Sequence, residues 1–158
     1  YIRTLCVDIG KKLGVGAHMQ ELRRTRVGAL SEEESVTLHD LKDAYELWKE
    51  DGYEAEIRRC IKPIERMLDY LPKIVVRDSA VDALCHGASL TLPGVLEVDS
   101  DIKKGDTVAV MTLKGEVVMV GKANMSTEEM LIRDTGVCVI PERVAMKRGT
   151  YPPMWKKR

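Results

Sequence analysis

Basic side chains gather at three places in the sequence, and their chemistry is the most readily interpreted in the chain. The clusters are Arg23, Arg24 and Arg26, then Lys147–Arg148, then Lys156–Lys157–Arg158. Guanidinium and ammonium groups bind phosphate, so each cluster is a candidate contact for RNA. An ordinary solvated charged face is the more common meaning of such a cluster, so both interpretations stay open.

Other kinds of reactive site are not suggested by the sequence. It holds no Ser/His/Asp order with a nucleophile elbow, and the glycine runs KKLGVG and TLKGE are turns rather than phosphate-binding loops. We expect reduced, mostly buried thiols in an intracellular protein, because the cysteines are far apart and form no CxxC pair. The histidines are equally scattered, and we expect no bound metal. The cysteines are Cys6, Cys60, Cys85 and Cys138.

The composition narrows the class of protein. The chain has 158 residues, of which 44% are hydrophobic and 32% charged, as expected of a folded domain and not of a disordered segment. No apolar stretch reaches the roughly 18 residues of a membrane span, so we expect no contact with a membrane. The 25 basic and 25 acidic residues cancel, which argues against a protein that coats nucleic acid along its whole length. The chain opens on Tyr1-Ile2-Arg3 without a methionine, and we expect a piece of a longer protein.

Two elements must position the first arginine cluster. Apolar residues recur at helical spacing over residues 2–13, and Gly14 supplies the stop, so we expect an amphipathic helix with one buried face. Residues 17–27 lack this period and fit a strand that ends at Gly28.

The chain then continues as helices. Thr37 is the expected N-cap of a helix that ends at Asp51–Gly52, with Asp40 three positions after the cap. A further helix runs to Leu68, and Pro63 should kink or split it.

From Lys73 onward the pattern is mostly that of β-structure. The expected elements are a strand at 73–77, a helix at 78–85, strands at 107–112 and 117–120, a turn or helix at 124–131 and a strand at 137–146. Lys114–Gly115 should close a tight hairpin, and closely spaced strands suggest a small barrel. We therefore expect an α+β protein with one domain at 1–72, a barrel at 73–150 and a tail at 151–158.

The motifs, taken in order, resemble a known family. The segments Tyr1–Leu5, Asp8–Gly10 and Gln20–Gly28 resemble the end of the catalytic domain of TruB-family pseudouridine synthases. The second half of the chain resembles a PUA domain. The segments that carry this resemblance are Arg77–Val81, Gly87–Ala88, Leu92–Val95, Lys104–Asp106, Lys114–Glu116 and Val120–Gly121. The run YIRTLCVDIG, followed by GAHMQELRRTRVG, this PUA half and a YPPMW tail, resembles more specifically the dyskerin branch, the catalytic proteins of archaeal and eukaryotic H/ACA guide-RNA particles.

The resemblance implies roles for residues of the first half. Arg3 matches the arginine that pairs with the catalytic aspartate, a carboxylate that lies in an upstream motif absent from this chain. Tyr1 matches the tyrosine that walls the uridine pocket, and Leu22 matches an apolar residue near the target base. The three arginines of the first cluster, Arg23, Arg24 and Arg26, would flank it. An isomerisation of this kind needs no cofactor, and the 158-residue chain alone should be inactive.

The resemblance also implies how RNA is held. A PUA domain of this branch grips the lower stem and the 3′ ACA of the guide RNA. The backbone of a glycine-containing loop would read the unstacked bases, and basic side chains would bind phosphates. The loop candidates are Gly87, Ala88, Leu92, Pro93, Gly94 and Val95, and the phosphate candidates are Arg77, Arg143, Lys147 and Arg148. Partners would be the H/ACA guide RNA, a substrate rRNA or tRNA and small accessory proteins of the particle.

Two alternatives remain open at this stage. One is a guide-independent synthase that acts on tRNA at the U55-type position, which the long PUA half and the tail disfavour. The other is a stand-alone PUA protein without catalysis, which leaves Tyr1 and Arg3 unexplained. The short C-terminus without a lysine-rich extension favours an archaeal, cytoplasmic protein over a eukaryotic, nucleolar one. The tail from Tyr151 to Trp155 should pack back on the body, since its aromatic rings would otherwise be exposed.

Overall fold

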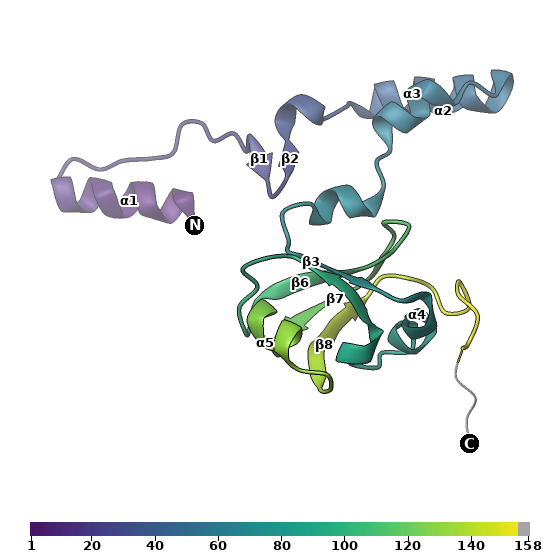
Figure 1. Ribbon diagram of the computed structural model, residues 1–158. Helices are drawn as coiled ribbons and strands as arrows, with labels where there is room; N and C mark the ends of the chain where they lie inside the picture. The colour runs from purple at the N-terminus through teal and green to yellow at the C-terminus, as the bar shows by residue number, and fades with distance from the viewer. Residues whose placement is uncertain (155–158) are drawn as a thin grey trace.

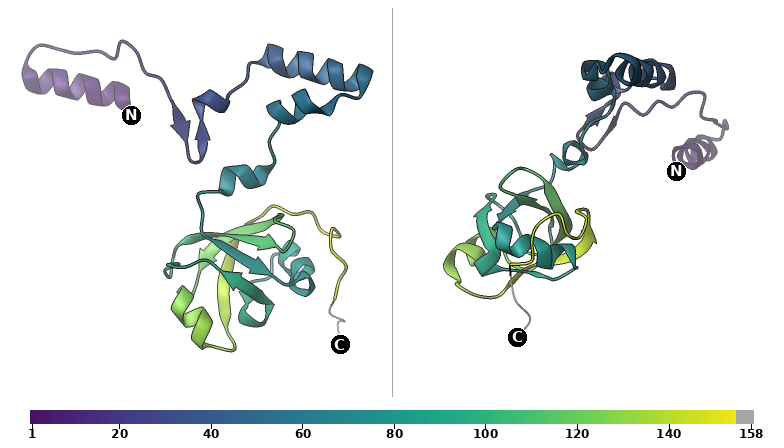
Figure 2. Two further views of the ribbon diagram at one scale, coloured as in Figure 1. Left: turned by 45° about the horizontal axis from the view of Figure 1, so that its top comes forward. Right: turned by 90° about the vertical axis from the view of Figure 1, so that its right-hand side faces the viewer.

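The protein consists of an extended N-terminal portion and a β-barrel at its C-terminal end (Figures 1 and 2). The computed structural model describes residues 1–154, so Trp155 and the basic cluster at 156–158 lie outside the described residues. Within residues 1–154, no helix has both the length and the apolar character that crossing a membrane requires.

The chain begins with helix α1, Ile2–Leu13, as the apolar spacing predicted. Gly14 ends the helix in the left-handed conformation at φ 71°, and its backbone N–H donates to the last carbonyls. The expected burial of one face is wrong. Leu5 and Ile9 are 52% and 48% exposed, and Gly10 is the buried residue of the helix. The amphipathic pattern identified the face correctly, but nothing in the described chain covers it.

The strand expected over residues 17–27 is also mostly wrong. Only its end, β1 at Arg26–Val27, pairs with another strand, β2 at Leu30–Ser31, through a turn at Gly28. A short 3₁₀ turn, η1 at Glu32–Glu34, follows. Residues 17–25 are irregular because no strand of the described chain pairs with them; the Thr25 carbonyl alone accepts a backbone hydrogen bond, from the Glu32 N–H at 2.8 Å.

Two packed helices stand away from the barrel. Helix α2, Leu38–Asp51, begins with the predicted capping box, in which the Asp40 N–H donates to Thr37 Oγ1 at 3.1 Å and the Thr37 N–H donates to the Asp40 carboxylate at 2.8 Å. Helix α3, Glu54–Cys60, packs against it. Pro63 does split the next helix, because the chain continues as a separate 3₁₀ segment, η2 at Ile64–Leu68.

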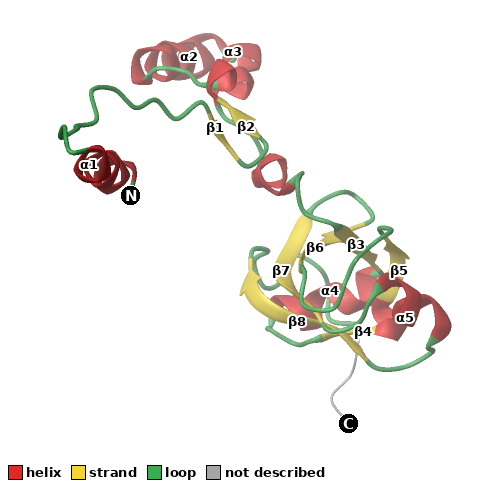
Figure 3. Ribbon diagram, turned by 90° about the vertical axis from the view of Figure 1, so that its left-hand side faces the viewer, coloured by secondary structure: helices red, strands yellow, loops and turns green. Residues whose placement is uncertain are grey.

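The second half forms one six-stranded sheet that curls into a nearly closed barrel (Figure 3). The strand order is β4-β8-β7-β6-β3-β5; β3 and β6 pair in parallel, and the other pairs are antiparallel. The elements are β3 Lys73–Val76, α4 Asp78–Cys85, β4 Leu90–Thr91, η3 Leu92–Gly94, β5 Val95–Val98, β6 Thr107–Thr112, β7 Val117–Ala123, α5 Thr127–Ile132 and β8 Val137–Val144. The predicted mixed fold with a small barrel is confirmed.

The hydrophobic core of the protein lies inside this barrel. Inward-facing residues such as Ile74, Val108 and Val118 are completely buried, and α4 adds Val81 and Leu84 to the same cluster. All four cysteines are free thiols, two of them buried and two partly buried. Burial raises the pKa of the Cys138 thiol to about 11, which keeps it protonated and unreactive at neutral pH.

The tail returns to the barrel, as expected, through Tyr151. This residue is buried, its hydroxyl donates to the Glu116 carboxylate at 2.7 Å, and the Lys114 ammonium lies 5.4 Å from the centre of its ring. The residues from Pro152 to Met154 are exposed. Tyr151 therefore fastens the tail to the hairpin between β6 and β7.

Candidate nucleic-acid interface

The three residues predicted to serve catalysis lie in the exposed N-terminal portion. Tyr1 is fully exposed in front of α1, Arg3 is exposed in its first turn, and Leu22 is 61% exposed in the irregular segment that follows. None of the ion pairs within residues 1–154 involves Arg3. Its guanidinium group is therefore available for a carboxylate outside the described chain.

A single glycine determines how the chain returns from the end of α1. Gly10 accepts hydrogen bonds from the N–H groups of Val15 and Gly16, at 3.2 and 3.3 Å. The backbone at Gly16 and Ala17 lies so close to Gly10 that a Cβ atom there would overlap both residues. From this contact the segment that carries Leu22 runs back in the direction of the N-terminus (Figure 1).

Gly10 was not among the predicted site residues. The sequence does carry a signal for it, because a glycine inside a helical pattern costs stability and therefore indicates a packing reason.

The first arginine cluster divides into two kinds of residue. Arg23 pairs with Glu32 in the 3₁₀ turn that follows the β1–β2 hairpin, so its charge is already balanced. Arg24 and Arg26 are exposed and take part in none of the ion pairs within residues 1–154. These two are the better candidates for contact with phosphate.

The candidate residues of the barrel gather around α4. Arg77 is exposed at the N-cap of α4, and its backbone N–H donates to the Gly94 carbonyl at 2.9 Å. This bond brings the η3 turn, which holds Pro93, against the start of the helix. Figures 1 and 2 show the segment that follows β8, residues 145–150, beside α4. Lys147 and Arg148 belong to this segment and are exposed, whereas the exposed Arg143 lies earlier, on β8 itself.

The loop residues differ in what they can offer to RNA. Gly87 and Ala88 are exposed after α4, and Gly87 has a positive φ of 86°, which favours glycine. Leu92 is buried in the core, and its backbone is already bonded, since its N–H donates to the Gly136 carbonyl at 3.0 Å and its carbonyl accepts from the Val95 N–H. Gly94 faces inward, because a Cβ atom there would lie 3.1 Å from Ala80 Cβ and 3.2 Å from Leu90 Cδ1. A bulky residue at position 94 would press on the barrel, not on RNA, and Val95 is half-buried in β5.

Residues 1–154 contain no group of three or more His, Cys, Asp or Glu side chains that could hold a metal ion. What the described chain offers at its surface is basic side chains, exposed glycine-containing backbone and one unpaired arginine near the N-terminus. Groups of this kind are the ones that bind phosphate in proteins.

Comparison with known families matches both halves of the chain. Residues 3–69 match the tRNA pseudouridylate synthase B C-terminal domain, and residues 72–145 match the PUA domain. The chain is 58% identical over 158 residues to the probable tRNA pseudouridine synthase B of Methanosarcina barkeri and 59% identical over 158 residues to that of Methanocaldococcus jannaschii. It aligns over its whole length and covers 47% of each relative. The chain thus spans about half the length of these curated relatives.

Solved structures agree with this similarity. A crystal structure of the archaeal box H/ACA sRNP Nop10–Cbf5 complex superposes on 98% of this chain with a TM-score of 0.89 and 56% identity, over 50% of the matched chain. A structure of an H/ACA RNP bound to a substrate RNA containing 2′-deoxyuridine superposes on 98% of this chain with a TM-score of 0.87 and 52% identity, over 49% of the matched chain. A Cbf5–Nop10–Gar1 complex superposes on 96% of this chain with a TM-score of 0.84 and 52% identity, over 46% of the matched chain.

Proposed function

The chain belongs to the TruB family of pseudouridine synthases, whose C-terminal domain it joins to a PUA domain, and we propose that it is the C-terminal part of an H/ACA-guided RNA pseudouridine synthase. The observation that carries the proposal is the superposition of nearly the whole chain on chains of H/ACA particles, one of them a Nop10–Cbf5 complex. The full-length protein would isomerise uridine to pseudouridine in rRNA or tRNA without a cofactor.

In the proposed reaction the bond from ribose C1′ to uracil N1 breaks, the base turns, and a bond from C1′ to C5 forms. C5 then loses its proton and N1 gains one, so the product is an isomer of uridine. An aspartate from the remaining part of the protein would serve at C1′. Arg3 would hold this carboxylate ionised through its planar two-nitrogen fork. Tyr1 would form a wall of the pocket for the flipped uridine, and Leu22 would pack beside the base. The exposed Arg24 and Arg26 would contact substrate phosphates.

The barrel would hold the guide RNA. Exposed basic residues around α4 and on β8 would bind its phosphates, which gives affinity but no sequence preference. Gly87, Ala88 and Pro93 are exposed. The N–H groups of Gly87 and Ala88 already donate to the Leu84 and Ala83 carbonyls, and proline has no N–H, so it is the backbone carbonyls of these residues that would accept hydrogen bonds from the unpaired bases of the 3′ ACA. The phosphate contacts would come from Arg77, Arg143, Lys147 and Arg148.

We further propose that the full-length protein assembles with small accessory proteins and works in archaeal cytoplasm. The similar solved complexes contain Nop10 and Gar1, and the curated relatives named above are archaeal.

A second function, guide-independent modification of tRNA, is favoured by the names of these relatives, which are tRNA pseudouridine synthases. A stand-alone PUA protein is disfavoured by the match of residues 3–69 to a synthase domain.

The decisive experiment measures pseudouridine formation by the full-length protein on rRNA and tRNA substrates, with and without a matching H/ACA guide. Guide-dependent turnover on rRNA supports the proposal, and equal turnover on tRNA without a guide supports the second function. Arg3→Lys keeps the charge but loses the fork, so it should abolish most turnover and leave guide binding unchanged. A variant with normal turnover and weakened guide binding would place Arg3 in the RNA interface instead.

A further inference from the structure

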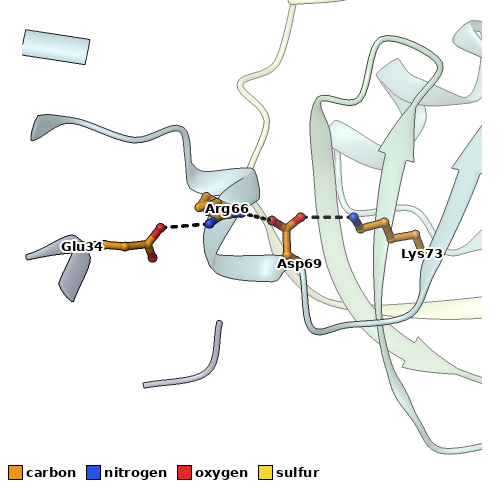
Figure 4. A network of polar contacts seen from close by, with 4 residues as sticks. All are labelled: Glu34, Arg66, Asp69 and Lys73. Carbon is orange, nitrogen blue, oxygen red and sulfur yellow. Dashed lines mark hydrogen bonds and ion pairs between the residues drawn. The ribbon is translucent and has the colours of Figure 1, made fainter. Parts of the chain in front are cut away.

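A chain of four charged residues crosses the junction between the N-terminal portion and the barrel (Figure 4). Arg66 Nη2 lies 3.0 Å from the Glu34 carboxylate, and Arg66 Nη1 lies 3.4 Å from Asp69. The other carboxylate oxygen of Asp69 lies 3.2 Å from Lys73 Nζ. Glu34 belongs to η1, Arg66 to η2 and Lys73 to the first barrel strand, β3, so this series of ion pairs links three elements.

On its barrel side, the junction segment is firmly attached. The Glu65 carboxylate accepts a hydrogen bond from the Val117 N–H at 3.0 Å. Leu68 and Leu71 pack against a small apolar cluster on β6 and β7, and the Ala109 N–H donates to the Pro72 carbonyl at 2.9 Å. The segment from Glu65 to Pro72 therefore moves with the barrel.

On its N-terminal side, the same segment is held by few contacts. The Glu34–Arg66 pair is the hydrogen-bonded link between residues 1–36 and residues 63–154. Tyr70 adds one packing contact, because a Cβ atom on Gly28 would lie 3.3 Å from its ring. A groove of about 490 Å³ separates much of the β2–η1 region from η2, so close packing does not fix their relative position.

The two nitrogens of Arg66 serve two different carboxylates, one on each side of the junction. The hydrogen bond from Arg66 to the Glu34 carboxylate lowers the pKa of Glu34. The same bond raises the pKa of Arg66, so both groups are charged at neutral pH. The side chains are 48% and 40% exposed, and ion pairs with this exposure add little stability. The effect of these ion pairs is therefore geometric. The planar guanidinium group of Arg66 bridges the two carboxylates and so sets the angle between the elements that carry them.

We propose that Arg66 is a positioning residue that sets the orientation of the barrel relative to the segment carrying Leu22 and Arg24. This inference rests on the proposed function. If the barrel holds the 3′ end of the guide and the N-terminal portion borders the target uridine, then a fixed junction fixes the distance along the RNA between these two points. A loosened junction accepts a wider range of distances.

The test uses the full-length protein in its assembled particle. A series of guides places the target pocket one base pair nearer to, or farther from, the 3′ ACA, and pseudouridine formation is measured for each. Wild type should show a sharp optimum. Arg66→Ala and Glu34→Ala should each reduce the preference for the optimal guide over its neighbours by roughly 3-fold, the ratio that an exposed ion pair supports. The double variant should match Arg66→Ala, because that variant has already lost the link to Glu34.

Arg58→Ala is the matched control. Arg58 is an exposed arginine that pairs with Glu54 within α3, away from the junction, so it should keep the wild-type optimum. Binding of the guide by each variant is measured separately and should be unchanged.

The outcomes distinguish the two proposals. No guide-dependent turnover in wild type would refute the proposed function and, with it, this inference. A sharp optimum that persists in Arg66→Ala, or a uniform loss of turnover at every spacing, would overturn the positioning role alone.

Discussion

Gly10 is where α1 and the returning chain touch, and Gly10→Ala should slow catalysis by the full-length enzyme about 100-fold. The new methyl group would overlap the backbone of Gly16 and Ala17. Because non-bonded atoms need a separation of about 3.5 Å, the returning segment must move by about 1 Å. Misplacement of a catalytic group by this distance can lower a rate by about 10²-fold. Single-turnover measurements of pseudouridine formation would test this, with guide binding measured alongside.

Gly14→Asn is the matched control for this experiment. Gly14 also has a positive φ, 71°, but a Cβ atom there would meet nothing within 4 Å, and asparagine tolerates the left-handed conformation. The asparagine variant should therefore retain nearly all of its activity. If Gly10→Ala folds, binds RNA and turns over as fast as this control, the close approach at Gly10 does not position Leu22 for catalysis.

Three further predictions concern the barrel. Gly121→Ala should destabilise it by about 1–3 kcal/mol in thermal or urea unfolding, because a methyl group would meet the backbone of β8; unchanged stability would contradict this. Replacing Lys147 and Arg148 with alanine should weaken the binding of specific and scrambled RNAs alike. The slope of log binding constant against log salt concentration should become shallower by about 0.7 per lost phosphate contact, and a loss of affinity confined to the specific RNA would contradict this prediction. The hydrogen bond from Tyr151 lowers the pKa of Glu116 below its ordinary 4.5, so this bond stabilises the fold above that pH, and the effect fades as pH falls further. On acidification from pH 7 to pH 3, the melting temperature of Tyr151→Phe should therefore fall by less than that of wild type. Equal falls in the two proteins would refute this.

Much of the barrel could be predicted because its signals are local. The α4 helix follows the apolar spacing from Asp78 to Cys85, and strand β6 coincides with the expected strand-like run from Thr107 to Thr112. The hairpin at Gly115 and the split at Pro63 depend on backbone restrictions that each residue carries with it.

The errors arose where structure depends on a partner distant in sequence. The apolar spacing of α1 shows that one face needs a cover but not what covers it. Residues 17–25 have a strand-like pattern, yet a strand exists only where a neighbour offers hydrogen bonds. The direction in which a residue faces could not be predicted for the same reason, because nothing local reveals that Gly94 faces Ala80 or that Arg23 pairs with Glu32.

The distribution of buried residues has a consequence for how the two halves behave. Within residues 1–154, Ala44 is the one buried hydrophobic side chain before Ile74; the others belong to the barrel, apart from Tyr151 of the tail that packs on it. Burial of apolar surface is the main stabilising contribution to folding, so the barrel contains its own core and the N-terminal portion does not. Ile2, Leu5 and Ile9 are instead about half exposed on α1, an apolar face that water does not favour. The chain spans about half the length of its relatives, and in the proposed full-length protein the other half would be the natural cover for this face. Under the proposed function, RNA binding by the barrel would then persist in this chain alone, whereas the uridine pocket would take shape only when both parts are joined.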